Sequence, residues 1–364
     1  MKPDISVIMS VYNGELYLAE AIDSVICQTF ENWELVVIND CSTDGTAAIL
    51  ADFASRDDRI KVHTNEVNLK LPASLNKAIS LCEGKYIARM DADDICLPQR
   101  LEKQFRFMEE HSDVALSSCR FMTVKNGVYM SGGAGGRCDS AALRAMLLVA
   151  NPILHPGVIA RAEVMKSFCY DTTLTCTEDL ELWTRMAMEN QKIEILPECL
   201  LIYRLHDKQI TSTTLERQHT EVLKIQKKYY GTLLEEPDEK MQEFYISGIY
   251  FKETADIQKY LDFAKWLRAK SGKSFDRNDA DYALLEILAE YKRCGVSRGD
   301  VMKAMLTFNP LFLIKEIIRR KNTAKADIAK CIKVAKEIGL VQTGGTEEFP
   351  IFEKDSRSQI NEIF

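Results

Sequence analysis

The sequence has no uninterrupted apolar run of about 18 residues, the length that a membrane-spanning helix requires. Near the N-terminus, Tyr12 and Asn13 interrupt a short apolar run that lacks the length and the cleavage site of a signal peptide. The eleven cysteines include no CxxC pair, and their odd number and irregular spacing predict reduced thiols rather than a disulfide framework. We therefore expect a cytoplasmic protein.

The sequence also has fewer basic than acidic residues. The 364 residues carry a formal net charge of −7, so we expect no broad basic surface and no nucleic-acid partner. Hydrophobic residues make up 46% of the chain and charged residues 28%, as in an ordinary globular protein. The length is sufficient for one large domain and a smaller one.

In the N-terminal part, apolar runs rich in β-branched residues alternate with amphipathic helical patterns. The predicted strands cover residues 5–11, 35–38, 60–63 and 86–88, and the predicted helices cover residues 15–28, 46–54 and 74–81. This alternation predicts an α/β fold with a mainly parallel sheet flanked by helices. In such a sheet, the ligand site lies at the carboxyl ends of the strands.

After residue 213, helical periodicity replaces this alternation. The predicted helical segments cover residues 215–230, 238–253, 255–270, 279–293, 298–306 and 310–337. We therefore expect an α/β domain over residues 1–213, an α-helical C-terminal region over 214–340, and a loose, weakly patterned tail over 341–364. The glycine-rich residues 125–140 predict a mobile loop.

Two acidic segments directly follow predicted strands. Asp40 lies after the second strand, where its carboxylate can accept a hydrogen bond from a base or a ribose hydroxyl; an ordinary turn with an Asp cap is the alternative. Asp91, Asp93 and Asp94 place like charges in the turn after the fourth strand, which is costly unless a cation binds. Magnesium and manganese prefer such carboxylates, whereas a solvated acidic loop is the alternative.

Two other polar features occur later in the chain. Glu178 and Asp179 precede the helix-like residues 180–185, and a carboxylate there is either a helix cap or a fixed general base. His206 follows the apolar residues 193–203, which return the chain towards the sheet. A lone histidine is more often structural than a ligand.

Taken in order, these segments resemble the family-2 glycosyltransferases of the GT-A fold. The resemblance extends over residues 3–212, and the order and spacing of its motifs are highly specific, although each motif alone is weak. The matching segments are residues 3–13, 20–30, 37–45, 86–94 and 98–101, together with Glu178 and Asp179.

The resemblance implies a role for each motif. Tyr12 matches the aromatic residue that lies against the nucleotide base, and Asp40 matches the acid that hydrogen-bonds this base, usually uracil. Asp91 and Asp93 match the DxD motif, which approaches the ribose and holds a manganese or magnesium ion on the diphosphate. Asp179 matches the catalytic base, with Glu178 beside it.

The resemblance also bears on three further positions, one of which departs from the family pattern. Arg89 precedes the DxD motif, as in many relatives, and is expected in the donor site. His206 lies where some relatives supply a further metal or diphosphate contact. Leu71 stands where relatives usually have glycine, which changes the expected loop shape but not the chemistry.

The implied reaction is the inverting transfer of a sugar from a nucleotide-sugar donor, usually a UDP-sugar, to an acceptor hydroxyl. The implied acceptor is a saccharide or lipid-linked saccharide in capsule or lipopolysaccharide O-chain synthesis, at the inner face of the cell membrane. Two alternatives are a nucleotidyltransferase of similar fold and an inactive nucleotide-sugar-binding protein. A nucleotidyltransferase needs a basic glycine-rich loop after the first strand, but residues 11–15 contain one glycine and no Lys or Arg.

The C-terminal region has one distinctive segment. Residues 301–335 contain eight Lys or Arg and two Asp or Glu, a local net charge of +6. The segment also has an apolar stripe, formed by Phe308, Leu311, Phe312, Ile314, Ile317 and Ile318. Such a stripe packs on the catalytic domain, contacts an anionic membrane surface, or joins the copies of a homo-oligomer.

Overall fold

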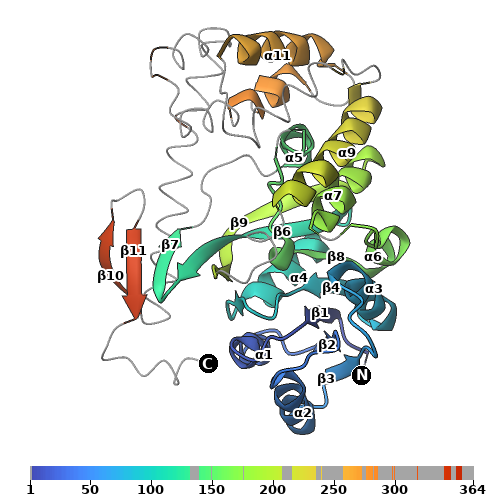
Figure 1. Ribbon diagram of the computed structural model, residues 1–364, viewed down its shortest axis with the longest axis vertical. Coiled ribbons are helices and arrows are strands. Elements are labelled where there is room, and N and C mark those ends of the chain that lie inside the picture. The colour runs from blue at the N-terminus through green and yellow to red at the C-terminus, as the bar shows by residue number, and fades with distance from the viewer. Residues whose placement is uncertain are drawn as a thin grey trace.

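The computed structural model describes a large α/β body and parts of the C-terminal region. The described residues are 2–131, 139–148, 150–174, 176–206, 215–234, 257–272, 276–281, 283–285, 340–345 and 350–354, with the single residues 239, 297, 299 and 318. Figure 1 shows one long sheet with helices on both of its faces. Within these ranges, no helix is long and apolar enough to cross a membrane.

The N-terminal half of the sheet is parallel. Its strands are β1 (Ile5–Val11), β2 (Trp33–Asn39), β3 (Ile60–Thr64) and β4 (Tyr86–Arg89), and the helices between them are α1 (Leu18–Ile26), α2 (Thr46–Arg56) and α3 (Leu71–Leu81). They lie in the order β4-β1-β2-β3, with parallel pairing throughout. Strand β1 is almost wholly apolar because helices cover both faces of the sheet. The predicted alternation is confirmed here.

The other half of the sheet is mixed. Its elements are β5 (Ile95–Cys96), α4 (Arg100–Glu110), β6 (Val114–Lys125), β7 (Val128–Ser131), α5 (Ser140–Met146), a 3₁₀ turn (His155–Gly157), β8 (Ile159–Arg161), α6 (Ala162–Phe168), α7 (Glu178–Met188) and β9 (Lys192–Arg204). Strand β9 runs parallel to β6, but β8 is antiparallel to both β4 and β6. The α/β class is thus confirmed, and the parallel pairing is concentrated in the first half.

Part of the glycine-rich segment is a strand rather than a loop. Asn126 and Gly127 have φ angles of 52° and 79°, which suit a tight two-residue hairpin turn between β6 and β7. The prediction of a mobile loop over 125–140 is therefore wrong for residues 128–131, and 132–138 lie outside the described residues.

The expectation of a loose tail over 341–364 is also wrong where the structure describes it. Strands β10 (Leu340–Gly345) and β11 (Pro350–Lys354) form an antiparallel hairpin, and β11 pairs with β7 (Figure 1). The edge of β7 offers unpaired backbone groups, and β11 satisfies them. Local periodicity could not reveal a pairing with a strand about two hundred residues earlier. Residues 355–364 lie outside the described residues.

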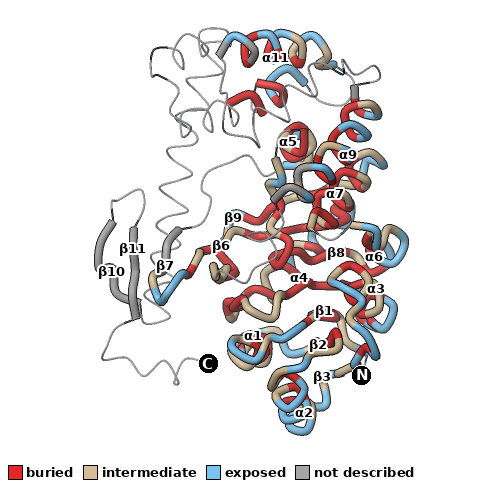
Figure 2. The backbone as a smooth tube through the Cα atoms, in the orientation of Figure 1, coloured by how far each residue is buried: buried red, intermediate tan, exposed pale blue. Residues whose placement is uncertain are grey.

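The first C-terminal helix packs onto the α/β body, and the next one contacts this helix through the rings of Trp266 and Tyr230. Helices α9 (Leu215–Leu234) and α11 (Ile257–Lys270) confirm the helices predicted over 215–230 and 255–270. The hydroxyl of Tyr229 donates to the backbone oxygen of Arg144 in α5, and the hydroxyl of Tyr230 donates to that of Leu148 just after α5, both at 2.8 Å. Figure 2 shows buried residues along the face of α9 that meets the body.

The remaining helical predictions fall largely outside the described residues. Residues 279–281 and 283–285 are helical, as predicted. Residues 238–253, 298–306 and 310–337 are described only at isolated positions, and the basic and apolar segment 301–335 only at Ile318.

Candidate active site

The loops after β1 and β2 are joined by reciprocal hydrogen bonds. The amide of Asn13 donates to Oγ of Ser42 (2.9 Å), and the amide of Thr43 donates to Oδ1 of Asn13 (2.8 Å). Asn13 has a φ of 55°, a left-handed conformation that asparagine tolerates well. Tyr12, at the end of β1, is 52% exposed, so its ring is available to a flat ligand.

Asp40 lies directly after β2 and is almost completely buried. Its Oδ1 accepts hydrogen bonds from the Asn65 side chain and the Leu69 amide, both at 2.8 Å, and its Oδ2 accepts one from the Lys70 amide at 2.9 Å. Lys70 has a φ of 71°, so this carboxylate holds the following loop in a left-handed turn just before Leu71 begins α3. Asp40 is thus a structural anchor as well as a candidate ligand for a base.

Three carboxylates gather after β4. One oxygen of each of Asp91, Asp93 and Asp94 lies within 4.8 Å of the others. Arg89, buried at the end of β4, binds Asp91 through both terminal nitrogens, with 2.5 Å between Nη1 and Oδ2. Because one guanidinium cannot neutralise three carboxylates, the cluster suits a hard divalent cation.

Asp94 is the buried member of this cluster. It has no exposed surface; its Oδ1 accepts from the Arg204 amide at 2.9 Å, and its Oδ2 has no hydrogen-bond partner among the described residues. A buried carboxylate oxygen without a partner is costly, and a bound cation would remove that cost. Burial and then the charges of Asp91 and Asp93 raise the pKa of Asp94 well above its usual range.

The end of β9 closes this centre. Nε2 of His206 lies 2.8 Å from Oδ2 of Asp93, so His206 joins the acidic cluster. Nε of Arg204 donates to the Asp93 carbonyl at 2.8 Å, and its Nη2 pairs with Glu20 of α1 at 2.5 Å. Sequence reasoning selected His206 but missed Arg204, although the two residues are only two positions apart.

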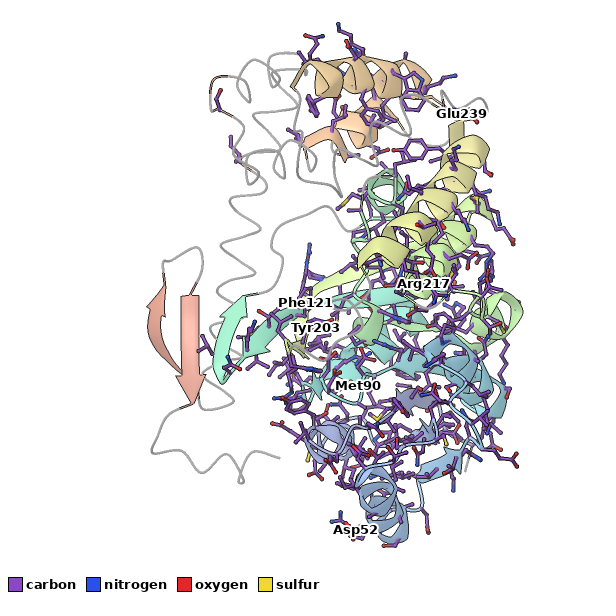
Figure 3. All side chains as sticks on the ribbon, in the orientation of Figure 1. Asp52, Met90, Phe121, Tyr203, Arg217 and Glu239 are labelled. Carbon is purple, nitrogen blue, oxygen red and sulfur yellow. The ribbon has the colours of Figure 1, made fainter. Side chains whose placement is uncertain are left out.

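An aromatic pair borders the cluster. Phe121 of β6 and Tyr203 of β9 lie side by side with their ring centroids 6.1 Å apart (Figure 3). Tyr203 immediately precedes Arg204, whose amide donates to Asp94, so the pair lies near the acids. Burial, followed by the charge of Asp91, raises the pKa of Tyr203. This pair carried no local motif, so the sequence alone did not identify it.

The candidate base lies in the first turn of α7. Oδ2 of Asp179 accepts from the Asn151 side chain at 2.7 Å, and its Oδ1 accepts from the Leu180 amide at 2.7 Å. Asp179 is half-buried, and this burial raises the pKa of its carboxyl while the two hydrogen bonds and Arg89 oppose the rise. Sequence reasoning missed Asn151, which reaches Asp179 from a separate loop.

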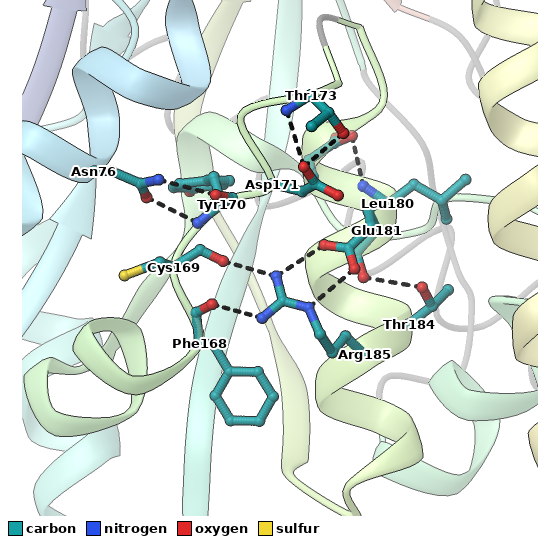
Figure 4. A network of polar contacts seen from close by, with 11 residues as sticks. Asn76, Phe168, Cys169, Tyr170, Asp171, Thr173, Leu180, Glu181, Thr184 and Arg185 are labelled. Atoms are coloured by element: carbon teal, nitrogen blue, oxygen red, sulfur yellow. Dashed lines mark hydrogen bonds and ion pairs between the residues drawn. The ribbon is translucent and has the colours of Figure 1, made fainter.

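Helix α7 is fixed by a polar network (Figure 4). Arg185 binds both carboxylate oxygens of Glu181 on its own helix, at 2.9 and 2.8 Å. Its terminal nitrogens also donate to the backbone oxygens of Phe168 and Cys169, at 2.5 and 2.7 Å. The loop after α6 is therefore tied to α7, and the first turn of α7 has a defined position.

Helix α9 also supports the first turn of α7. Oγ1 of Thr177 donates to Oε2 of Glu221 at 2.8 Å, and Nε of Arg217 binds Oε1 of Glu221 at 3.0 Å. Thr177 occupies the N-cap position of α7, but its side chain makes no capping bond. Thr177 instead connects the residue before Glu178 and Asp179 to the C-terminal region.

Arg89 links the acidic cluster to α7 electrostatically. Its charge lowers the pKa of Asp91, Glu178 and Asp179, whereas burial, the largest effect on each, raises it. The pKa of Asp91 rises to about 6, because burial and the charge of Asp93 outweigh the effect of Arg89. The acidic cluster and the candidate base therefore influence each other's pKa values. Such strongly perturbed groups are typical of functional sites.

The amino-acid sequence is similar to those of known glycosyltransferases. The family model for glycosyl transferase family 2 matches residues 6–156. An uncharacterised glycosyltransferase of Methanocaldococcus jannaschii is 30% identical over 253 residues, which cover 69% of this chain and 84% of that protein. The O-antigen biosynthesis glycosyltransferase WbnJ of Escherichia coli is 32% identical over 219 residues, covering 58% of this chain and 83% of WbnJ.

A solved structure confirms the fold. TarS of S. aureus, residues 1–349 in complex with UDP-GlcNAc, superposes with a TM-score of 0.54 at 19% identity, covering 80% of this chain and 90% of that one. The expected GT-A fold is therefore confirmed. On the family model and the extent of its relatives, the chain is a glycosyltransferase that belongs to glycosyl transferase family 2.

Proposed function

We propose that the protein is an inverting, metal-dependent enzyme that transfers a sugar from a UDP-sugar to an acceptor hydroxyl. The observation that carries this proposal is the cluster of Asp91, Asp93 and Asp94, which suits a divalent cation and which His206 joins. Asp179, held by Asn151, is the carboxylate proposed as the base. In this proposal the acids hold the leaving group and Asp179 holds the acceptor hydroxyl. The UDP-GlcNAc complex of TarS supports a UDP-linked donor.

The donor nucleotide would lie across the loops after β1, β2 and β4. Tyr12 offers an exposed ring for stacking against the base, and Asp40 offers the remaining lone pair of Oδ2 to a ring N–H. Arg89 would act in the donor site through Asp91, because both of its terminal nitrogens are committed to that carboxylate.

A manganese or magnesium ion would be held by Asp91 and Asp93, with Asp94 and His206 beside them. Such an ion, when bound, offsets the negative charge that develops on the departing diphosphate. Arg204 keeps this part of the site in position, since it holds the Asp93 carbonyl and the Asp94 carboxylate at once.

Asp179 would take the proton of the acceptor hydroxyl. As the proton moves to the carboxylate, the acceptor oxygen forms a bond to the anomeric carbon, and the bond from that carbon to the diphosphate oxygen breaks on the opposite face. The configuration at this carbon is thereby inverted. A positioned base typically contributes about 10²–10⁴-fold to the rate, and Asn151 would keep Asp179 oriented.

The acceptor is proposed to be a saccharide or lipid-linked saccharide of a cell-surface polysaccharide, such as capsule or O-chain. The similarity to WbnJ supports this class. We assign catalysis to residues 1–213 and acceptor, membrane-surface or oligomer contacts to residues 214–340. The site then works in the cytoplasm, at the inner face of the membrane.

A nucleotide-sugar screen tests the proposal. Metal-dependent hydrolysis of a UDP-sugar, and selective thermal stabilisation by UDP with manganese, are expected. Selective stabilisation by a nucleoside triphosphate would instead indicate a nucleotidyltransferase. Binding of UDP-sugars without any turnover would indicate an inactive binding protein.

A further inference from the structure

Glu178 and Asp179 are adjacent, but their side chains have different surroundings. Glu178 is 6% exposed, whereas Asp179 is half-buried and held by Asn151. Within the part of the chain that the structure describes, Oε2 of Glu178 is buried and has no hydrogen-bond partner. Its Oε1 lies 3.9 Å from Nδ1 of His155, which is too far for a hydrogen bond.

Among the described residues, no Lys or Arg forms an ion pair with Glu178, and Arg89 acts on it only through its charge. Burial, and then the charge of Arg89, lower the pKa of His155 well below its usual range, so the imidazole is neutral. Nε2 of His155 is 2.8 Å from the hydroxyl of Tyr170. The guanidinium of Arg89 is bound to Asp91 through both terminal nitrogens.

The titratable groups that act on Glu178 come from several elements of the fold. They are Asp179 on α7, Arg89 at the end of β4, Asp91 in the acidic turn, His155 in the 3₁₀ turn and Tyr170 after α6. Two of these groups are carboxyls, one is a cation bound elsewhere, and two are neutral. A second negative charge at Glu178 would therefore be buried, unpaired and beside Asp179.

We propose that Glu178 is a positioning residue that works as a neutral carboxylic acid, so that Asp179 alone carries the negative charge of the pair. Uncharged, Glu178 fills its buried site without increasing the proton affinity of Asp179. Asp179 then stays ionised and ready to accept the proton of the acceptor. This inference rests on the role proposed above for Asp179. It is consistent with the pKa of Glu178, which burial and the charge of Asp179 raise to about 7.

The proposal has a consequence for stability that does not depend on catalysis. A carboxyl with a raised pKa in the folded state binds its proton more tightly there than in the unfolded chain. Stability therefore falls as the pH rises from the ordinary glutamate value to about 7. The substitution Glu178→Gln keeps the size and neutrality of the side chain and removes this loss.

Thermal unfolding of the full chain tests this consequence. The Tm of Glu178→Gln minus that of wild type should increase by a few degrees between about pH 5 and about pH 8. The matched control is Glu189→Gln, which removes an exposed carboxyl at the other end of α7 and should give a constant difference. A constant difference for Glu178→Gln as well would overturn the proposal.

Turnover provides the second readout. Glu178→Gln should retain kcat within about threefold of wild type at neutral pH, whereas a loss of about a hundredfold would show that an anion is needed and would overturn the proposal.

If Glu178→Gln does not fold, infrared spectra of the wild-type protein with isotope-labelled glutamate carboxyls test the proposal instead. The proposal predicts the infrared band of a protonated glutamate carboxyl below about pH 6, and this band should be lost above about pH 8. Absence of the band below about pH 6 would overturn the proposal. If Asp179→Asn keeps full turnover, the proposed base fails, while the Tm result still reports on Glu178.

Discussion

Nε2 of His206 lies 2.8 Å from Oδ2 of Asp93, and this contact brings together two residues that are 113 positions apart. The end of β9 therefore completes a centre that begins at the end of β4. A metal ligand is usually oriented by a neighbouring polar group. Asp93 would be the ligand of the proposed ion, and His206 would orient it.

The first prediction concerns the ion. Asp93→Ala removes a carboxylate of the cluster and should nearly abolish turnover of a UDP-sugar, as should removal of divalent cations with EDTA. Donor turnover with added manganese or magnesium is the measurement. Asp52→Ala is the control, since Asp52 is an exposed residue of α2 that pairs with Arg56 at the surface. Full activity in EDTA would contradict the role of the metal.

The second prediction concerns the base. Asp179→Asn keeps the shape of the side chain but cannot take a proton, so turnover should fall at least about a hundredfold while donor affinity is retained. Stopped assays and UDP titration by calorimetry measure the two quantities separately. Loss of UDP binding in this variant would make Asp179 a donor-site or structural residue instead.

The third prediction concerns the base pocket. Asp40→Ala removes the acceptor of three hydrogen bonds from Asn65, Leu69 and Lys70, and should destabilise the protein by about 1–3 kcal/mol. It should also weaken UDP binding much more than it slows turnover of bound donor. Unfolding curves and calorimetry test both effects, with Asp52→Ala as the exposed control. Equal UDP affinity in the variant and wild type would argue against this placement.

The fourth prediction is a pH dependence of metal binding. Burial raises the pKa of Asp91 to about 6 in the metal-free protein, so this carboxyl is protonated at lower pH. A cation must then displace the proton, and the apparent manganese affinity should fall about tenfold for each pH unit below about 6 and level off above it. Calorimetric titration of the metal-free protein measures this. A constant affinity between about pH 5 and about pH 7 would show that Asp91 is not a ligand.

The fifth prediction concerns the basic segment 301–335. If it contacts a membrane, the protein should sediment with anionic vesicles at low salt, and the binding should weaken as salt is added. Changing Arg319, Arg320 and Lys321 to Glu should greatly reduce it. Ile318, beside these residues, is 54% exposed. Failure to sediment with anionic vesicles at low salt would leave the segment as a packing or oligomer surface.

The parallel half of the fold could be predicted because its signal is local. Strands such as β1 are buried on both faces, so their apolar runs are visible in the sequence. The hairpin between β6 and β7 also has a local signal, Asn126-Gly127, although the glycine content of the segment favours a loop. The pairing of β11 with β7 had none, because it joins distant segments.

Some residues of the candidate site are likewise indicated by local sequence, whereas others depend on contacts between distant segments. Asp40, Asp91, Asp93 and Asp179 belong to short segments that resemble motifs of the family, and this resemblance predicts their roles. Arg204 and Asn151 act through contacts with Asp94 and Asp179 that lie 110 and 28 positions away. Their importance follows from the folded arrangement, which no single segment encodes.

The hydrogen bond between Thr177 and Glu221 has a practical consequence for engineering. A chimera that exchanges the C-terminal region at residue 213 would cut the chain before α9. It would lose Glu221 beneath the turn of Asp179, and Tyr229 and Tyr230 at the end of α5. A graft intended to change the acceptor should therefore keep α9 with the recipient and join the chains after Leu234.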